Sequence, residues 1–160
     1  MEGDAESLPF ADQAFDAVLC ECSLCTFGDK ERAVAEVHRV LRPGGRLAIA
    51  DVVAVRSRLP AALRGALAQV ACVGDALSEG ELLALVEGAG FESLAVEDRA
   101  ADAGALAERV EDRLRGARLL GWGQAGAAPV SVEEAIELVR LARRALASGA
   151  LGYAIVTARR

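Results

Sequence analysis

The sequence is poor in aromatic residues and lysine, and it contains no long apolar run. Its 160 residues include four phenylalanines, one tryptophan and one tyrosine, and Lys30 is the only lysine. Acidic side chains outnumber basic ones by 24 to 18, for a formal net charge of -6. A nucleic-acid-binding surface, which needs a positive patch, is therefore not expected. No apolar run reaches the roughly 18 residues of a membrane span, and the acidic start at Met1–Asp4 lacks the apolar region of a secretory signal.

The remaining composition is that of a globular protein. Hydrophobic residues make up 53% and charged residues 26% of the chain, which predicts one domain over residues 1–160 with a single core. Three of the four cysteines lie within six positions, and we expect reduced thiols in a cytoplasmic protein rather than a disulfide scaffold. Packing, metal binding and thiol chemistry remain open for each of them. The cysteines are Cys20, Cys22, Cys25 and Cys72.

The first third of the chain predicts a strand, a helix and a second strand. Phe15–Cys20 is almost continuously apolar, as in a strand buried on both faces of a parallel sheet. Asp29 can cap a helix whose apolar residues recur at helical spacing. Pro43-Gly44-Gly45 would end that helix, and Arg46–Val53 is a second apolar strand. Short connections between these elements predict a right-handed crossover between parallel strands.

The rest of the chain predicts more helices and two further strands, which makes a single α/β domain. One helix, from about Asp102 to Leu120, is expected to pack through a stripe of Leu106, Val110 and Leu114. Gly121–Gly126 is expected to be a loop. The other predicted elements are a helix from Pro60 to about Val70, capping-box helices beginning at Ser78 and Ser131, and strands at Phe91–Glu97 and Tyr153–Thr157.

Three stretches, in this order, resemble the class I S-adenosylmethionine-dependent methyltransferases. They are Gly3–Phe10, Phe15–Val18 and Arg39–Leu47, and Ala89-Gly90-Phe91 before a strand agrees with them. The branch is the one that contains the quinone-biosynthesis C-methyltransferases and the arsenite methyltransferases.

The resemblance implies a fold for this chain. The family's sheet has the strand order 3-2-1-4-5-7-6, with strand 7 antiparallel, and strands 4 to 7 map onto this sequence. We therefore expect a partial Rossmann-like sheet in the order 4-5-7-6, with flanking helices and an antiparallel last strand. The chain would begin at the end of strand 3, as an N-terminally truncated domain. The family's Gly-rich cofactor loop and the acidic residue that holds the ribose would both be missing.

The resemblance also implies a cofactor and candidate residues. The cofactor would be S-adenosylmethionine, with Asp4 and Ala5 at the positions that contact adenine. Glu21 lies just beyond strand 4, next to the position of the sulfonium. No side chain is indicated as a catalytic acid or base, and direct methyl transfer requires no metal cofactor.

Two cysteines lie where arsenite methyltransferases place arsenic-binding thiols. Cys22 and Cys72 would then form a thiol pair that binds As(III), a soft ion that thiolates select. A structural zinc or iron–sulfur site formed by Cys20-x-Cys22-x-x-Cys25 together with Cys72 is an alternative, but a second cysteine knuckle is missing and Cys20 ends an apolar strand.

The leading hypothesis is methyl transfer to a small-molecule acceptor, with a thiol-bound metalloid such as arsenite as one candidate. The alternative is a catalytically inactive remnant or an interaction module. Under either hypothesis, the apolar strand at Phe15–Cys20 would lie at an edge of the sheet. Exposed apolar edges recruit partners, so we expect a homo-oligomer or a partner chain that covers this edge.

Overall fold

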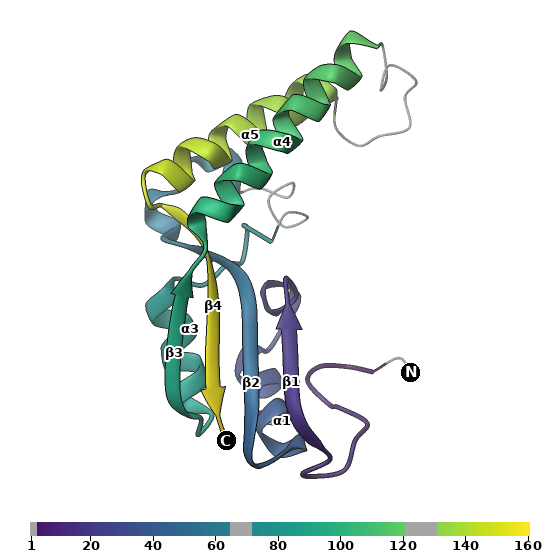
Figure 1. The fold of residues 1–160 in the computed structure, drawn as a ribbon, viewed down its shortest axis with the longest axis vertical. Helices are drawn as coiled ribbons and strands as arrows, with labels where there is room; N and C mark the ends of the chain where they lie inside the picture. Colours follow the sequence, from purple (N-terminus) through teal and green to yellow (C-terminus); the bar gives the residue numbers. More distant parts are fainter. Residues whose placement is uncertain (1–2, 65–71, 121–130) are drawn as a thin grey trace.

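The computed structural model describes residues 3–64, 72–120 and 131–160, which form a four-stranded sheet with helices on one face. The α4–α5 hairpin extends beyond one end of the sheet, as Figure 1 shows. The helices and strands are β1 (Phe15–Glu21), α1 (Lys30–Val40), β2 (Leu41–Ala54), α3 (Glu79–Gly88), β3 (Glu92–Asp98), α4 (Ala100–Leu119), α5 (Val132–Ala147) and β4 (Leu151–Arg159). Short 3-10 turns lie at η1 (Leu24–Thr26), η2 (Arg56–Arg58) and η3 (Ala61–Arg64).

The sheet has the strand order and directions that the sequence predicts. The order is β1-β2-β4-β3, which corresponds to 4-5-7-6 in the family's numbering. β1 is parallel to β2, with Val18 opposite Leu47, and β4 is antiparallel to both β2 and β3. Because β1 and β2 are parallel, their carboxyl ends meet at one edge of the sheet. The segments that leave this edge carry the cysteines.

The turn Pro43-Gly44-Gly45 lies inside β2 rather than before it. The pairing with β1 jumps from Phe15 opposite Leu41 to Ala17 opposite Arg46, so the turn is accommodated as a bulge. Gly44 has φ +77°, a conformation that glycine adopts without strain. The predicted strand therefore begins at Leu41 rather than at Arg46.

Helices α1 and α3 begin at the predicted caps and cover one face of the sheet. The Asp29 carboxylate accepts a hydrogen bond from the backbone N–H of Arg32, at 2.9 Å. Ser78 and Glu81 form the predicted capping box. The helix predicted from Pro60 is a short turn, η3, as far as Arg64; its remainder and the Gly121–Gly126 loop lie outside the described residues. Buried residues of the main core include Val34, Leu41, Leu47, Ile49, Leu82, Val86, Phe91 and Val156.

The opposite face of the sheet is open within the described residues, which corrects the prediction that β1 is buried on both sides. Leu19 is 68% exposed. Neighbouring positions on the same face are small or polar, among them Ala17 and Thr157. An apolar sequence therefore does not show by itself that both faces of a strand are covered, since covering needs a second layer of helices.

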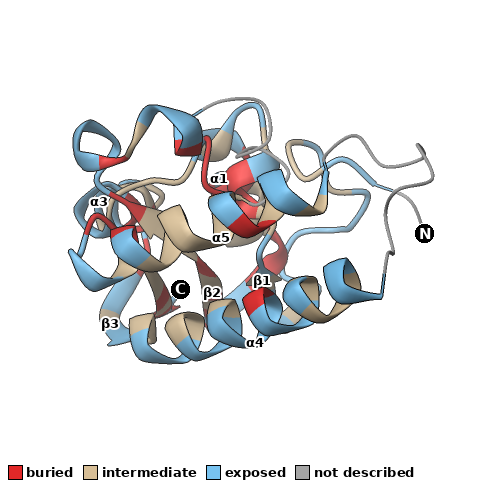
Figure 2. Ribbon diagram, turned by 90° about the horizontal axis from the view of Figure 1, so that it is seen from above, coloured by how far each residue is buried: buried red, intermediate tan, exposed pale blue. Residues whose placement is uncertain are grey.

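Helix α4 does not pack through its predicted apolar stripe. Leu106 is 55% and Val110 is 37% exposed, whereas Glu111 is 1% exposed. Glu111 lies against α5, where Arg140 and Arg143 bind its carboxylate at 3.0 and 2.7 Å. Leu114 is half-buried, and ion pairs from Glu111 and Glu108 to arginines of α5 join the two helices. Figure 2 shows α4 exposed along most of its length, and none of the described helices has the length and apolar character needed to cross a bilayer.

Candidate functional site

The candidate site begins where β1 ends. Glu21, the last residue of β1, is exposed and lies opposite Ala50 of β2. The next residue, Cys22, donates its backbone N–H to the carbonyl oxygen of Ala50, at 2.9 Å. The chain then turns into η1, where Cys25 is 8% exposed. The sequence thus places two cysteines directly beyond the carboxyl end of a parallel strand, where α/β folds bind ligands.

Cys72 lies next to the backbone of Cys22, although 50 residues separate them, but the two thiols do not face each other. The Sγ of Cys72 donates to the carbonyl oxygen of Cys22, at 3.4 Å. The Sγ of Cys22 lies 3.4 Å from the hydroxyl of Tyr153. Both cysteines have positive φ, +46° for Cys22 and +59° for Cys72. This left-handed backbone costs a residue other than glycine about 1–2 kcal/mol, and such strain clusters at functional sites.

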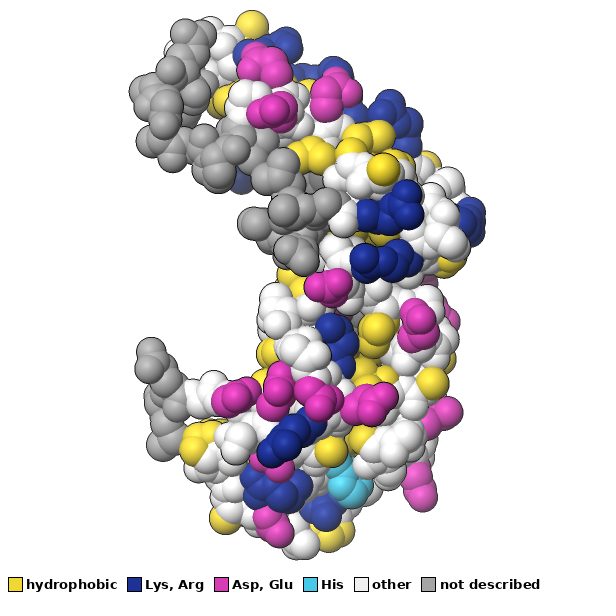
Figure 3. All heavy atoms as spheres, turned by 180° about the vertical axis from the view of Figure 1, so that it is seen from behind, with side chains coloured by type: hydrophobic (Ala, Val, Ile, Leu, Met, Phe, Trp, Pro, Cys, Tyr) yellow, Lys and Arg dark blue, Asp and Glu magenta, His cyan; other side chains and the backbone are white. Residues whose placement is uncertain are grey.

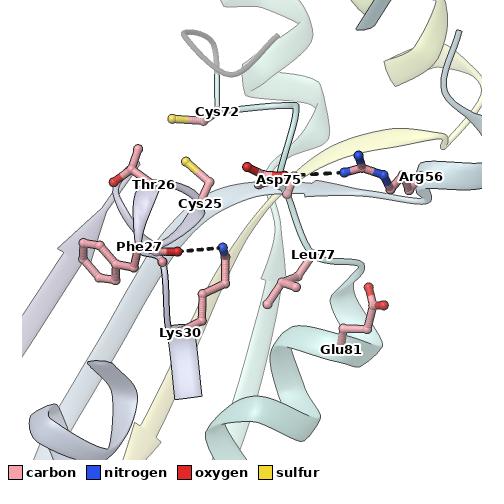
Figure 4. Close-up of a pocket in the computed structure, with 11 residues that line it drawn as sticks. Cys25, Thr26, Phe27, Lys30, Arg56, Cys72, Asp75, Leu77 and Glu81 are labelled. Carbon is pink, nitrogen blue, oxygen red and sulfur yellow. Dashed lines mark hydrogen bonds and ion pairs between the residues drawn. The ribbon is translucent and has the colours of Figure 1, made fainter. Parts of the chain in front are cut away.

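A cavity of about 730 Å³, large enough for a small molecule, is lined by Cys25 and Cys72 but not by Cys22. In Figure 4 the sulfurs of Cys25 and Cys72 face the same space. The polar part of the wall holds both signs of charge: Arg56 lies 3.6 Å from Asp75, and Lys30 donates to the carbonyl of Phe27 at 3.1 Å. The lining residues are Cys25, Thr26, Phe27, Gly28, Lys30, Arg56, Cys72, Asp75, Ala76, Leu77 and Glu81.

Burial keeps the inner thiols protonated. It raises the pKa of Cys25 to about 12, helped by the hydrogen bond with Cys72 and the charge of Asp51. Burial also raises the pKa of Cys20, whose Sγ lies 3.2 Å from the hydroxyl of Ser23. At neutral pH these groups are thiols, which bind a soft ion only when that ion displaces the proton.

Asp51 is a residue of the site that the sequence analysis missed. It is 3% exposed. Burial raises the pKa of Asp51, and this effect outweighs the nearby backbone N–H groups of Val52 and η1, which favour the carboxylate and lower the pKa. Its Oδ1 accepts from Val52 N at 2.8 Å, while its Oδ2 has no hydrogen-bond partner within the described residues. The signal was present in the sequence, because Asp51 is the only charged residue between Leu47 and Val55.

Asp4 and Ala5 lie in a turn that is bound to the beginning of α1. The Asp4 Oδ1 accepts from Glu6 N at 2.9 Å, and the Glu6 carboxylate accepts from Asp29 N at 2.8 Å. Asp4 Oδ2 and the backbone N–H of Ala5 form no hydrogen bond within the described residues. The Asp4 Oδ2 acceptor and the Ala5 N–H donor are therefore both available. An adenine edge offers the complementary pair, an amine donor and a ring-nitrogen acceptor. Asp4, Ala5 and Glu21 do not line the cavity.

One ion pair holds the N-terminal segment in place. Glu36 of α1 accepts from Leu8 N at 2.8 Å and binds Arg39 at 2.7 Å. Arg39 in turn donates to the carbonyl oxygens of Leu8 and Phe10. Figure 3 shows acidic and basic side chains interleaved on this face of the molecule. The Glu36–Arg39 pair thus positions the segment that carries Asp4 and Ala5.

Comparisons with known proteins agree with the fold. Residues 1–49 match the family model described as a methyltransferase domain. An arsenite methyltransferase from Halobacterium salinarum is 33% identical over 94 residues, which cover 59% of this chain and 24% of that protein. A demethylmenaquinone methyltransferase from Thermus thermophilus is 49% identical over 51 residues, which cover 32% of this chain and 23% of that protein. The matches span about a quarter of each curated relative.

A solved structure matches nearly the whole chain. It is phosphoethanolamine N-methyltransferase 2 from Haemonchus contortus, in complex with phosphomonomethylethanolamine and S-adenosylhomocysteine. The TM-score is 0.79 at 15% identity, and the match covers 98% of this chain and 36% of that one. At 15% identity, this similarity supports a shared fold and no shared function.

The Glu36–Arg39 pair predicts how the N-terminal segment responds to pH. The hydrogen bond and charge of Arg39 lower the pKa of Glu36 to about 2, from an ordinary 4.5. A lowered carboxyl pKa stabilises the folded state above the unfolded value, and this contribution is lost as the pH falls from about 4.5 toward 2. Hydrogen exchange at the Leu8 amide, followed by NMR, should therefore show weakening protection over that range, beyond the intrinsic pH dependence.

Glu36→Ala should remove this response and speed exchange at Leu8 about fivefold at pH 6, since one hydrogen bond is lost. Glu31→Ala, an exposed carboxylate in the first turn of α1, is the matched control. Equal protection of Leu8 in both variants would contradict the assignment.

Proposed function

Because the chain belongs to the class I S-adenosylmethionine-dependent methyltransferases, we propose that it forms the acceptor side of a methyl-transferring domain. The observation that carries the proposal is the cavity of about 730 Å³ beside the carboxyl ends of β1 and β2. Ligands of open α/β sheets bind beyond these strand ends. A small acceptor in this cavity would contact residues of η1 and of the 72–77 segment.

The residues of this chain fit one side of the cofactor. S-adenosylmethionine supplies a methyl group on a sulfonium sulfur. Asp4 Oδ2 would accept from the exocyclic amine of adenine, and the backbone N–H of Ala5 would donate to a ring nitrogen. Glu21, at the end of β1, is the described carboxylate nearest in sequence to the thiols. The remaining contacts, above all a Gly-rich loop, would come from another segment or chain.

Calorimetric titration of the full chain with S-adenosylmethionine tests this arrangement. We expect weak but measurable binding that weakens about fivefold in Asp4→Ala, which loses one hydrogen bond to adenine. Asp16→Ala is the control, since Asp16 is exposed and pairs with Arg42 at the other end of β1. Absence of heat with the parent chain would exclude cofactor binding by this chain alone and favour an interaction module.

For the acceptor, we propose a thiophilic metalloid such as arsenite. The hydrogen bond from the Cys72 Sγ to the backbone carbonyl of Cys22, and the strained backbone of both residues, support the proposal that the two thiols turn toward a shared ligand. As(III) would exchange oxygen ligands for the two thiolates, with release of water. Its lone pair would then attack the methyl carbon, so that an As–C bond forms, the C–S bond of the sulfonium breaks and arsenic is oxidised from As(III) to As(V). Holding the arsenic in line with the methyl group supplies most of the catalysis.

Replacing either thiol tests this acceptor. We expect Cys22→Ser and Cys72→Ser each to weaken As(III) binding at least about tenfold. Loss of a residue that only supports a metal ligand already lowers affinity by about that factor, and loss of the ligand itself should lower it at least as much. Cys20→Ser is the control, because the Sγ of Cys20 contacts Ser23 instead. Equilibrium dialysis of reduced protein measures the affinity. Unchanged binding in either variant would dismiss arsenite as the acceptor.

A second candidate function, that of an interaction module, is favoured by the uncovered sheet. Among the described strands, β1 pairs only with β2, which leaves one edge of β1 free. The open face of the sheet also presents Leu19, 68% exposed. Free edges and exposed leucines recruit a partner. We propose that a second copy or a partner chain covers this edge, under either function.

Sedimentation velocity at micromolar concentration tests the association. We expect the parent chain to sediment as a dimer or larger species and Leu19→Lys to shift it toward the monomer. Leu119→Lys, at a still more exposed leucine on α4, should leave the association unchanged. A monomeric parent chain would contradict the proposal that this edge recruits a second copy.

A further inference from the structure

Three ligand-type side chains converge at the edge of the cavity, and only one of them belongs to the predicted thiol pair. They are Cys25 from η1, Asp51 from β2 and Cys72 from the segment before α3. Their ligand atoms all lie within 4.8 Å of one another. Cys25 and Asp51 are buried and Cys72 is partly buried, so the cluster is not an exposed patch of charge.

A second, independent observation points to a ligand here. Asp51 is 97% buried, yet its Oδ2 has no hydrogen-bond partner within the described residues. A buried acceptor without a partner destabilises the fold, so such an atom is expected to bind a ligand or a water. Cys25 and Asp51 also border a void of about 10 Å³, which is close to the space of a single water or ion.

We propose that Cys25, Cys72 and Asp51 bind a thiophilic divalent cation of the zinc type, with a fourth coordination position open to the cavity. Two sulfurs and one oxygen form a donor set that selects such ions over magnesium or calcium. Three protein ligands with one open position are the arrangement of catalytic zinc sites.

The distances are compatible with a small rearrangement. A tetrahedral zinc with bonds of about 2.3 Å to sulfur and 2.0–2.2 Å to oxygen holds its ligand atoms about 3.5–3.8 Å apart. The present atoms, within 4.8 Å of one another, therefore need to approach by about 1 Å. The side chain of Cys72 is partly exposed, so it has room for most of this movement.

The charges also balance. Two thiolates and a carboxylate around a divalent ion leave one net negative charge, and Lys30, on α1, lies close enough to Cys25 to favour its thiolate. Binding would release the thiol protons, including the one that burial now keeps on Cys25. This site differs from a zinc knuckle formed by the Cys20–Cys25 segment, because Cys20 faces Ser23 and Cys22 faces Tyr153.

Cobalt(II), a spectroscopic substitute for zinc, tests the site in the full chain after removal of metals under reducing conditions. We expect one equivalent to bind, with sulfur-to-cobalt charge-transfer absorption, and zinc to displace it. Cys25→Ser, Cys72→Ser and Asp51→Asn should each weaken binding at least about tenfold. Cys20→Ser and Cys22→Ser should leave it unchanged.

The controls separate this proposal from the proposed function, on which it does not rest. Cobalt binding is measured without S-adenosylmethionine or arsenite, and Cys22→Ser should affect arsenite but not cobalt. If circular dichroism shows that Asp51→Asn does not fold, the Cys72→Ser variant decides the test, because Cys72 is partly exposed and its replacement should not prevent folding. No binding by the parent chain, or equal binding by Cys25→Ser and Cys72→Ser, would overturn the cation site.

Discussion

The parallel pairing of β1 with β2 is the constraint on which the candidate site depends. Because both strands run in the same direction, the segments that follow Glu21 and Ala54 leave the sheet at one edge. The backbone hydrogen bond from Cys22 to Ala50 continues that pairing by one residue beyond β1. Without this register, Cys22 and Cys25 would not approach Asp51 on the neighbouring strand, and the cavity would lose one wall.

The elements that the sequence predicts well are those with local causes. Asp29 and the capping boxes at Ser78 and Ser131 fix helix starts through hydrogen bonds within one turn, so each is visible in a few letters. The strand order followed from resemblance to a family rather than from periodicity. Pro43-Gly44-Gly45 was predicted to precede a strand, but it forms a bulge because β1 and Arg160 supply partners that the local sequence does not reveal.

The errors concern what covers each element. Leu106 and Val110 have the spacing of a core stripe, yet the core lies elsewhere, and α4 turns Glu111 toward the arginines of α5. A buried carboxylate with several arginine partners can also join two helices, and hydrophobic spacing cannot detect such a contact. Asp51 was missed because the role of a charged residue inside an apolar strand depends on its neighbours in space. Here those neighbours, Cys25 and Cys72, are distant in the sequence.

The positive φ angles of Cys22 and Cys72 have a consequence for how such a sequence evolves. Glycine would adopt either conformation freely, and it would recover about 1–2 kcal/mol at each position. Cysteine at these two positions is therefore less favourable for stability than glycine, and stabilising substitutions of this kind are readily available to a protein. In homologous chains, glycine at either position would mark a lineage in which the sulfur has become dispensable, whereas cysteine at both would indicate selection for the thiols themselves.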